Sequence, residues 1–419
     1  MILFNISKCL LLSLLIKYNF YNNRIIKILL KNIHSCGVIP VKIIQWALPL
    51  LKLMNLDKNI LNVFENTYEK CPNHNIEYTK ELYKNDFYND IDDEYKIIEL
   101  VGSGSIAQVY KIQDIKSEKY YAMKVIHPKA IENFITIKFY LKIIFTFYDF
   151  NKIIPTNLDN FLNQFEEQLN LINESNNIMK FNEIYKNNNL FIIPELYKIS
   201  KNIIIMDYVE GKSIETITTN IQHYKYNMII SIFMYNNLFI NNFNHGDLHN
   251  YNWKITDDNK IIIYDFGLCW ESNNTLTDPL DDLFLGFHKE DNELIYKAFK
   301  SYFKDTDEKN IKGYFYSIPE KINKFFIFSK YILLYSLKNN ILLDIDILYT
   351  IITYQNSLLI YMKNYKDAGF DFNGIYKEQY NICDYYSILP KYQEYLLKQI
   401  DIFKKKDNID YSSFNKFIK

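Results

Sequence analysis

One short segment limits the fold of this chain more than any other part. It reads H-G-D-L-H-N-Y-N from His245, so that Asp247 stands five residues before Asn252. An apolar stretch follows it and ends in D-F-G at Asp265. Phosphoryl transfer needs this arrangement, because one carboxylate orients or deprotonates the nucleophile while an amide oxygen and a second carboxylate hold Mg²⁺. D-F-G alone is common by chance, but the combination at this separation is specific.

A glycine-bearing hairpin upstream fits the same chemistry. Residues 100–109 read L-V-G-S-G-S-I-A-Q-V between two predicted strands. Glycines let such a turn close over phosphates, because backbone N–H groups approach without a Cβ in the way. Lys124 on the next strand would face the phosphates, and a lysine in so apolar a run needs a carboxylate partner. The predicted nucleotide-binding residues of this region are Gly102, Ser103, Gly104, Ser105, Val109 and Lys124.

Two further observations support this interpretation. Residues 206–209 read M-D-Y-V and predict a hinge, in which the main chain of Asp207 and Val209 contacts the adenine edge. Glycine is scarce, with 10 in 419 residues, and half of the glycines fall on these segments. They are Gly102, Gly104, Gly211, Gly246 and Gly267. In a chain that otherwise avoids glycine, this clustering indicates positions where the backbone itself is needed.

The basic residues exclude several classes of function. Arg24 is the only arginine, and the formal net charge is -1. Bidentate readout of guanine and arginine-based phosphate pockets need the guanidinium fork, which lysine cannot replace. We therefore expect no nucleic-acid partner. The five cysteines are scattered without a C-x-x-C pair, which argues against a disulfide framework and a thiolate zinc site and favours a reducing compartment.

Hydrophobic patterning predicts an α+β chain, with helices up to residue 89, strands after it, and a mainly helical second half. Residues 131–185 are predicted to be helical. The predicted strands span residues 95–101, 108–113, 120–126, 190–193, 203–209, 253–255 and 261–264.

These motifs together resemble the protein-kinase-like fold, and within it the UbiB-like, aarF-domain-containing atypical kinases. The resemblance covers most of residues 33–290. Residues 37–47 resemble the family's upstream K-x-G-Q segment, with Lys42 and Gln45 in the conserved places. Residues 123–128 resemble its lysine strand, and E-S-N-N from Glu174 resembles its E-A-x-N helix.

The resemblance implies a two-lobed protein-kinase-like fold with a helical N-terminal extension and a helical insert in the small lobe. The corresponding domains are a K-x-x-Q extension over 1–89, a small lobe over 90–209 and a helical large lobe over 210–419. It implies an Mg²⁺-dependent, ATP-binding kinase or ATPase, linked to isoprenoid lipids or a membrane surface. The implied roles are base or water-orienting residue for Asp247, phosphate contact for Lys124 paired with Glu174, metal ligands for Asn252 and Asp265, and gate for Lys42 and Gln45.

The sequence also departs from the family pattern. Ile44 replaces the glycine of K-x-G-Q, and Gln168 and Asn170 replace the two acids of the family's E-x-D. The loss of two carboxylates removes acceptors for Lys42. We therefore expect Lys42, Gln45, Gln168 and Asn170 to form a gate held by neutral hydrogen bonds instead. Gly246 stands where ordinary protein kinases have arginine, which argues against activation through an arginine pocket.

Other interpretations stay open at this stage. The loop at Asp247 also suits small-molecule phosphotransferases resembling aminoglycoside and choline kinases, and the whole chain could be a nucleotide-binding pseudokinase scaffold. A metal site at His245 and His249 lacks a third ligand. Lys404–Lys406 predicts a solvated helix face, with a membrane-surface role as the alternative.

The compartment and the phosphoryl acceptor are also open. The apolar stretch over residues 2–16 is too short to span a bilayer and predicts an amphipathic helix packed on its own domain. A signal or organellar targeting segment is the alternative interpretation. The expected protein is intracellular, soluble or peripheral to a membrane, of open oligomeric state.

Overall fold

The computed structural model describes residues 23–35, 73–104, 106–147, 154–272, 274–303, 306–322, 325–351 and 372–404. The chain divides into two compact units. The first comprises residues 1–179 and 195–208, and the second comprises residues 180–194 and 209–419. Each unit is considered by itself below.

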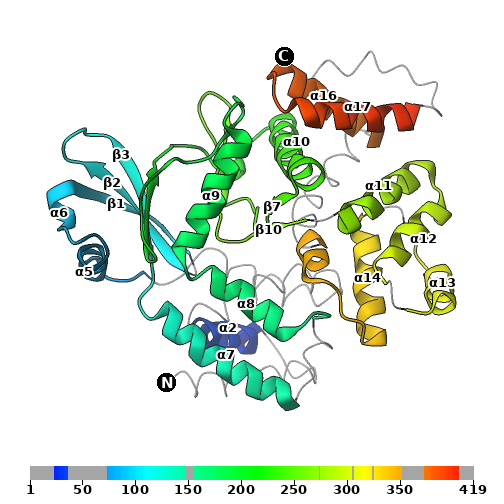
Figure 1. Cartoon of the computed structure of the whole chain (residues 1–419), viewed down its shortest axis with the longest axis horizontal. Coiled ribbons are helices and arrows are strands. Elements are labelled where there is room, and N and C mark those ends of the chain that lie inside the picture. Colours follow the sequence, from blue (N-terminus) through cyan, green and yellow to red (C-terminus); the bar gives the residue numbers. More distant parts are fainter. Residues whose placement is uncertain are drawn as a thin grey trace. The chain divides into compact units, whose positions relative to one another are not determined.

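The first unit is built on an antiparallel sheet of five strands in the order β1-β2-β3-β6-β5. The strands are rich in Ile, Val and Tyr, which fit a pleated, half-buried surface. They are β1 (Tyr95–Ser103), β2 (Ala107–Asp114), β3 (Tyr120–Ile126), β5 (Leu196–Ile199) and β6 (Ile203–Asp207), and Figure 1 shows the first three as cyan arrows.

Two helices cover one face of this sheet, α5 (Ile76–Phe87) and α6 (Ile91–Glu94). Tyr83 of α5 and Ile91 of α6 are fully buried against alternate residues of the strands, including Met123 and Val125 of β3. Successive side chains of a strand point to opposite faces. Lys124, between Met123 and Val125, therefore lies on the face away from α5.

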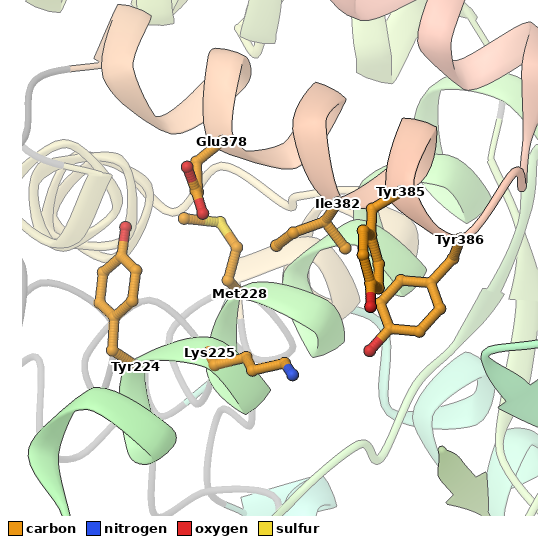
Figure 2. A pocket seen from close by; sticks show the side chains of 7 residues that line it. All are labelled: Tyr224, Lys225, Met228, Glu378, Ile382, Tyr385 and Tyr386. Atoms are coloured by element: carbon orange, nitrogen blue, oxygen red, sulfur yellow. The ribbon is translucent and has the colours of Figure 1, made fainter. Parts of the chain in front are cut away.

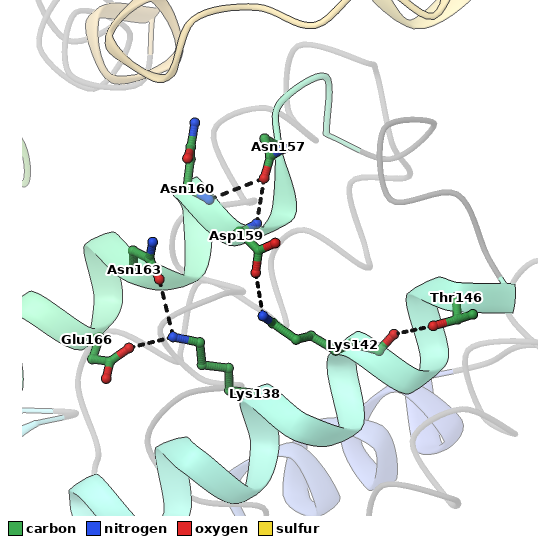
Figure 3. A network of polar contacts seen from close by, with 8 residues as sticks. All are labelled: Lys138, Lys142, Thr146, Asn157, Asp159, Asn160, Asn163 and Glu166. Atoms are coloured by element: carbon green, nitrogen blue, oxygen red, sulfur yellow. Dashed lines mark hydrogen bonds and ion pairs between the residues drawn. The ribbon is translucent and has the colours of Figure 1, made fainter.

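A helical insert follows β3. It consists of α7 (Ala130–Phe147) and α8 (Leu158–Glu167), and α9 (Leu171–Tyr185) comes after it. Figure 3 shows the polar contacts that join α7 and α8. Lys138 binds Glu166 at 2.5 Å, and Lys142 binds Asp159 at 2.6 Å. The later lysine on α7 pairs with the earlier acid on α8, so the two helices run antiparallel.

The second unit has two small sheets among helices. The first pairs β4 (Phe191–Ile192), β9 (Ile261–Ile263) and β8 (Trp253–Ile255), and the second pairs β10 (Cys269–Glu271) with β7 (Phe243–His245). A 3₁₀ turn, η3 (Ile214–Thr216), and a π-helical turn, η4 (Asn237–Asn241), lie between larger elements. The helices are α10 (Asn220–Asn236), α11 (Asn274–Lys289), α12 (Asn292–Ser301), α13 (Glu308–Tyr316), α14 (Phe325–Asn339), α16 (Phe372–Tyr385) and α17 (Pro390–Lys404).

An aromatic cluster forms the core beside the small sheets. Phe181, from the second half of α9, lies 5.6 Å from Phe233 of α10 and 5.0 Å from Phe266, measured between ring centroids. All three rings are buried. Offset and tilted aromatic pairs at such separations contribute about 0.5–1.5 kcal/mol beyond the area that they bury.

The structure confirms the mixed helix and sheet class, with an antiparallel sheet in the first part and helices in the second. The predicted strand over 120–126 has the bounds of β3. The domain bounds at 89/90 and 209/210 stay predictions. Outside α2 (Asn23–Ser35) and the residues from 73 onward, the N-terminal extension lies outside the described residues. Among the described helices, none is long and apolar enough to cross a membrane.

Candidate functional site

Lys124 and Glu174 form a buried ion pair in the first unit. Nζ of Lys124 lies 2.6 Å from Oε1 of Glu174, and the two side chains are 11% and 2% exposed. Lys124 comes from β3 and Glu174 from the first half of α9. Val109 is the cross-strand neighbour of Lys124, so its side chain lies on the same face of the sheet. A buried ion pair adds little net stability, which makes this pair a candidate for a functional role.

The glycine-bearing loop joins β1 and β2, and β2 in turn pairs with β3, the strand that carries Lys124. Gly104 N–H donates to the carbonyl of Ala107 at 2.9 Å and closes the turn. A Cβ added at Gly102 would meet nothing within 4 Å, and one at Gly104 would meet only the Ala107 oxygen at 3.5 Å. The surrounding protein therefore does not demand glycine here, and the space above the loop suits a bound group that needs close backbone approach. Ser105 lies outside the described residues.

Some main-chain groups of the predicted hinge already form hydrogen bonds within the protein. Asp207 N–H donates to the carbonyl of Glu195 at 2.9 Å, and the Val209 carbonyl accepts from the Tyr264 hydroxyl at 3.1 Å. Asp207 also binds Lys119 through its side chain, at 3.2 Å. These bonds involve neither the carbonyl of Asp207 nor the N–H of Val209. That these two groups contact adenine stays a prediction.

In the second unit, a hydrogen bond joins the predicted catalytic residue Asp247 and the predicted metal ligand Asn252. Nδ2 of Asn252 donates to the carbonyl of Asp247 at 2.8 Å. The bond uses the amide nitrogen of Asn252, and the amide oxygen is the atom that this side chain can offer to a cation. Asn252 is 7% exposed, and its main chain bonds to His249 and Tyr264. The loop therefore holds this amide in one orientation.

His245 forms hydrogen bonds that hold the loop containing Asp247. Its Nδ1 accepts from the N–H of Asp247 at 3.2 Å, and its Nε2 lies 3.1 Å from the carbonyl of Tyr264. Burial lowers the pKa of His245, so the ring is neutral with its proton on Nε2. Both ring nitrogens are thus in use, which counts against the metal site at His245 and His249. Among the described residues, no group of three His, Cys, Asp or Glu side chains could hold a metal ion.

Gly246 has a steric reason to be glycine. A Cβ at this position would lie 2.8 Å from Cγ of Leu268 and 3.2 Å from the Leu268 carbonyl oxygen. The N–H of Gly246 also donates to that oxygen at 2.8 Å. The tight pairing of β7 with the segment after D-F-G therefore excludes the arginine that ordinary protein kinases have here.

The D-F-G segment combines an unusual backbone with a buried anchor. Asp265 has φ 52°, in the left-handed region that non-glycine residues seldom adopt. Phe266 is 1% exposed and lies 5.2 Å from the His245 ring. Strained residues of this kind cluster at functional sites. Asp265 and Asn252 together provide carboxylate and amide oxygens, the hard donors that Mg²⁺ takes.

The positions that replace the family's E-x-D have structural roles here. Gln168 ends α8, and its Nε2 donates to the carbonyl of Gln164 at 3.2 Å. The side chain of Asn170 accepts from the N–H of Ile172 at 3.1 Å and caps the start of α9, the helix that carries Glu174. The predicted gate residues Lys42 and Gln45 lie outside the described residues, as do residues 2–16, Lys405 and Lys406.

A separate pocket lies between α10 and α16 of the second unit, lined by Tyr224, Lys225, Met228, Glu378, Ile382, Tyr385 and Tyr386 (Figure 2). Burial raises the pKa of Glu378 to about 7. None of the predicted site residues lines this pocket. Its acid therefore takes no part in the site described above.

Two further histidines lie beside the glycine-bearing loop. His127 lies within the predicted lysine-strand segment, although its sequence context assigned it no role, and His74 was missed altogether. No spacing rule could have found them, since the two are 53 residues apart.

The fold and the two clusters define a protein-kinase-like chain. The sequence model of the ABC1 atypical kinase-like domain matches residues 66–299, more than half of the 419 residues. The chain therefore belongs to the ABC1 atypical kinase-like family, also called the UbiB family. The match confirms the resemblance, and the family is one of atypical kinases and ATPases.

Comparisons with individual proteins add little. A search of curated proteins finds no match. Among solved structures, the chain is similar to a Mycobacterium tuberculosis protein solved as the Rv3197–erythromycin complex, at 16% identity and a TM-score of 0.46. The similarity covers 57% of this chain and 65% of that one, so the chain spans less than two thirds of this structure's length.

Proposed function

We propose that the protein binds Mg-ATP and transfers the γ-phosphoryl group to an acceptor or to water. One observation carries the proposal, the buried pair of Lys124 and Glu174 at 2.6 Å. Lysine held by a carboxylate on a sheet face, downstream of a glycine-bearing loop, is the arrangement with which protein-kinase-like enzymes contact phosphates.

The residues fit the two groups that this reaction needs. The open space at Gly102 would admit phosphate oxygens close to the backbone. The amide oxygen of Asn252 and the carboxylate of Asp265 would hold Mg²⁺. Bound magnesium would neutralise charge that develops on the transferred phosphoryl group.

Asp247 takes the role of base or water-orienting residue. The phosphorus–oxygen bond to ADP breaks and one to the acceptor oxygen forms, while the acceptor's proton passes to Asp247. The carboxylate of Asp247 is 17% exposed on its side chain, so an incoming hydroxyl group can reach it. Nε2 of His249 lies 3.8 Å from it, too far for a strong hydrogen bond.

The acceptor is proposed from the family alone. Kinship with the UbiB family favours an isoprenoid lipid or a membrane surface as the partner, and the single arginine, Arg24, disfavours nucleic acid.

The test is ATP turnover by the full chain and by Asp265→Asn. We expect this variant to lose at least about a hundredfold in turnover, since it removes a charged metal ligand, while its unfolding temperature stays within a few degrees of wild type. Asp257→Asn is the matched control, because Asp257 lies on a hairpin in the same unit, is 88% exposed and contacts only Lys212 among the salt bridges described.

The outcomes separate the candidates. Unchanged turnover in Asp265→Asn would remove the catalytic interpretation. Stimulation of turnover by membranes or phenolic isoprenoid head-group analogues would support the lipid link, and transfer to a protein would indicate an ordinary kinase. Thermal stabilisation by nucleotide without turnover would favour a pseudokinase scaffold, and transfer to a small soluble alcohol would favour a small-molecule phosphotransferase.

A further inference from the structure

Two histidines of the first unit lie ring to ring next to the glycine-bearing loop. His127 follows β3, and His74 precedes α5. Their Nδ1 atoms are 2.9 Å apart, and the rings are perpendicular, with centroids 5.0 Å apart. Two imidazoles approach this closely only when one N–H lies between them, so at most one of the facing nitrogens carries a proton.

His127 holds the loop through both its main chain and its ring. Its N–H donates to the carbonyl of Ile106 at 2.9 Å, and its Nε2 lies 3.0 Å from the carbonyl of Gly104. Oγ of Ser103 is near the same nitrogen, at 3.4 Å. One residue thus contacts groups on both arms of the turn.

The direction of each hydrogen bond follows from these partners. A carbonyl only accepts, so Nε2 of His127 carries the proton and its Nδ1 accepts from Nδ1 of His74. Nε2 of His74 lies 2.9 Å from the hydroxyl of Thr79, which is also 3.3 Å from the hydroxyl of Tyr110. Donation therefore runs from His74 through His127 to the carbonyl of Gly104, and we call this chain of hydrogen bonds the histidine relay.

The charge state of the histidines agrees with this order. Burial, followed by the nearness of His127, lowers the pKa of His74 to about 4. Burial also lowers the pKa of His127, although its bond to Gly104 acts in the opposite direction. Both rings are therefore neutral near pH 7, as the shared N–H requires.

The far end of the relay is anchored as well. The side chain of Gln108 accepts from the N–H of His74 at 2.9 Å and donates to its carbonyl at 3.2 Å. Gln108 is fully buried on β2. His74 is therefore held by its main chain on one side and by both ring nitrogens on the other.

We propose that His127 and His74 are positioning residues for the phosphate loop. They hold the carbonyl of Gly104 and so order a turn that its glycines would otherwise leave mobile, before any nucleotide arrives. They also couple this turn to the segment that leads into α5. The inference rests on the proposed function only in assigning the loop to phosphate.

The first measurement needs no nucleotide. Hydrogen exchange at residues 102–107 in the full chain reports the order of the turn, because the N–H of Gly104 is bonded to Ala107. We expect exchange to be about threefold to tenfold faster in His127→Ala, as loss of one hydrogen bond predicts. His127→Gln, which restores a donor, should return it toward wild type, and His74→Ala should show a smaller acceleration.

The second measurement is ATP kinetics. The KM for ATP should rise by about threefold to tenfold in His127→Ala with little change in kcat, since a disordered loop weakens binding. His223→Ala is the matched control. Its ring also lies at hydrogen-bond distance from a carbonyl, that of Ile217 at 2.8 Å, but it belongs to the second unit.

Each result has a defined meaning. Unchanged exchange in both His127→Ala and His74→Ala overturns the inference, and exchange over the rest of the chain verifies that the variants fold. Faster exchange with an unchanged KM in an active enzyme also overturns it, because the loop would then be ordered for some other purpose. If the wild type neither binds nor hydrolyses ATP, the proposed function fails, while the exchange data still decide whether the histidines order the turn.

Discussion

Removing one partner of the Lys124–Glu174 pair should destabilise the first unit far more than removing both. At 2.6 Å and an effective dielectric constant of about 20, the Coulomb attraction is about 6 kcal/mol. Desolvation of the two ions costs several kcal/mol each and offsets most of it. Lys124→Met keeps the cost for Glu174 and loses the attraction, so we expect a loss of about 3–5 kcal/mol.

The double variant Lys124→Met/Glu174→Leu tests this reasoning. It removes both charges and should unfold within about 1–2 kcal/mol of wild type, because neither desolvation cost remains. Hydrogen exchange of the β2 and β3 amides in increasing urea measures local unfolding of the sheet that carries Lys124. If the double variant loses the sum of the two single losses, the two side chains do not act as a pair and the argument from burial is refuted.

Two further predictions concern the second unit and the histidine relay. Gly246→Ala should destabilise the second unit by about 1–3 kcal/mol through overpacking against Leu268, and Leu268→Ala in the same chain should recover part of the loss in urea denaturation. Since His74 has a pKa of about 4 when folded and about 6.5 when unfolded, its contribution to stability is complete above pH 6.5 and is lost as pH falls from 6.5 to 4. The unfolding midpoint should therefore fall more steeply over this range in wild type than in His74→Gln, and equal slopes would contradict a neutral His74.

The sequence predicted those strands that carry a strong apolar pattern. β3 and β8 were bounded correctly, and β1, β2 and β9 were found to within one or two residues, because their apolar runs end at polar residues or glycine. β5 was missed, since L-Y-K-I is short and its residues are half-buried or exposed. β7 and β10 were missed as well, because strands of three residues are defined by their partners rather than by their own pattern.

For the candidate site too, some features could be predicted from the sequence and others depend on the folded structure. The resemblance of the segment at Glu174 to the family's E-A-x-N helix allowed its pairing with Lys124 to be predicted, and the structure places Nζ of Lys124 and Oε1 of Glu174 in contact. The roles of Asn170 and Gly246 could not be read in advance, because they depend on the start of α9 and on the path of the chain at Leu268. The relay through His74 joins residues from separate elements, and only the folded sheet brings them together.

The first unit is interrupted in sequence, which restricts how this protein can be divided. Residues 180–194 belong to the second unit, and residues 195–208 return to the first. A fragment that ends at residue 179 would lack β6 and leave the lysine strand β3 as an open edge, which invites aggregation. One that ends at residue 208 would carry β4 without its partner β9. A cut after residue 179 divides the first unit, and a cut after residue 208 divides the second. No single cut in the gene therefore leaves both units intact, so the two must be produced as one chain.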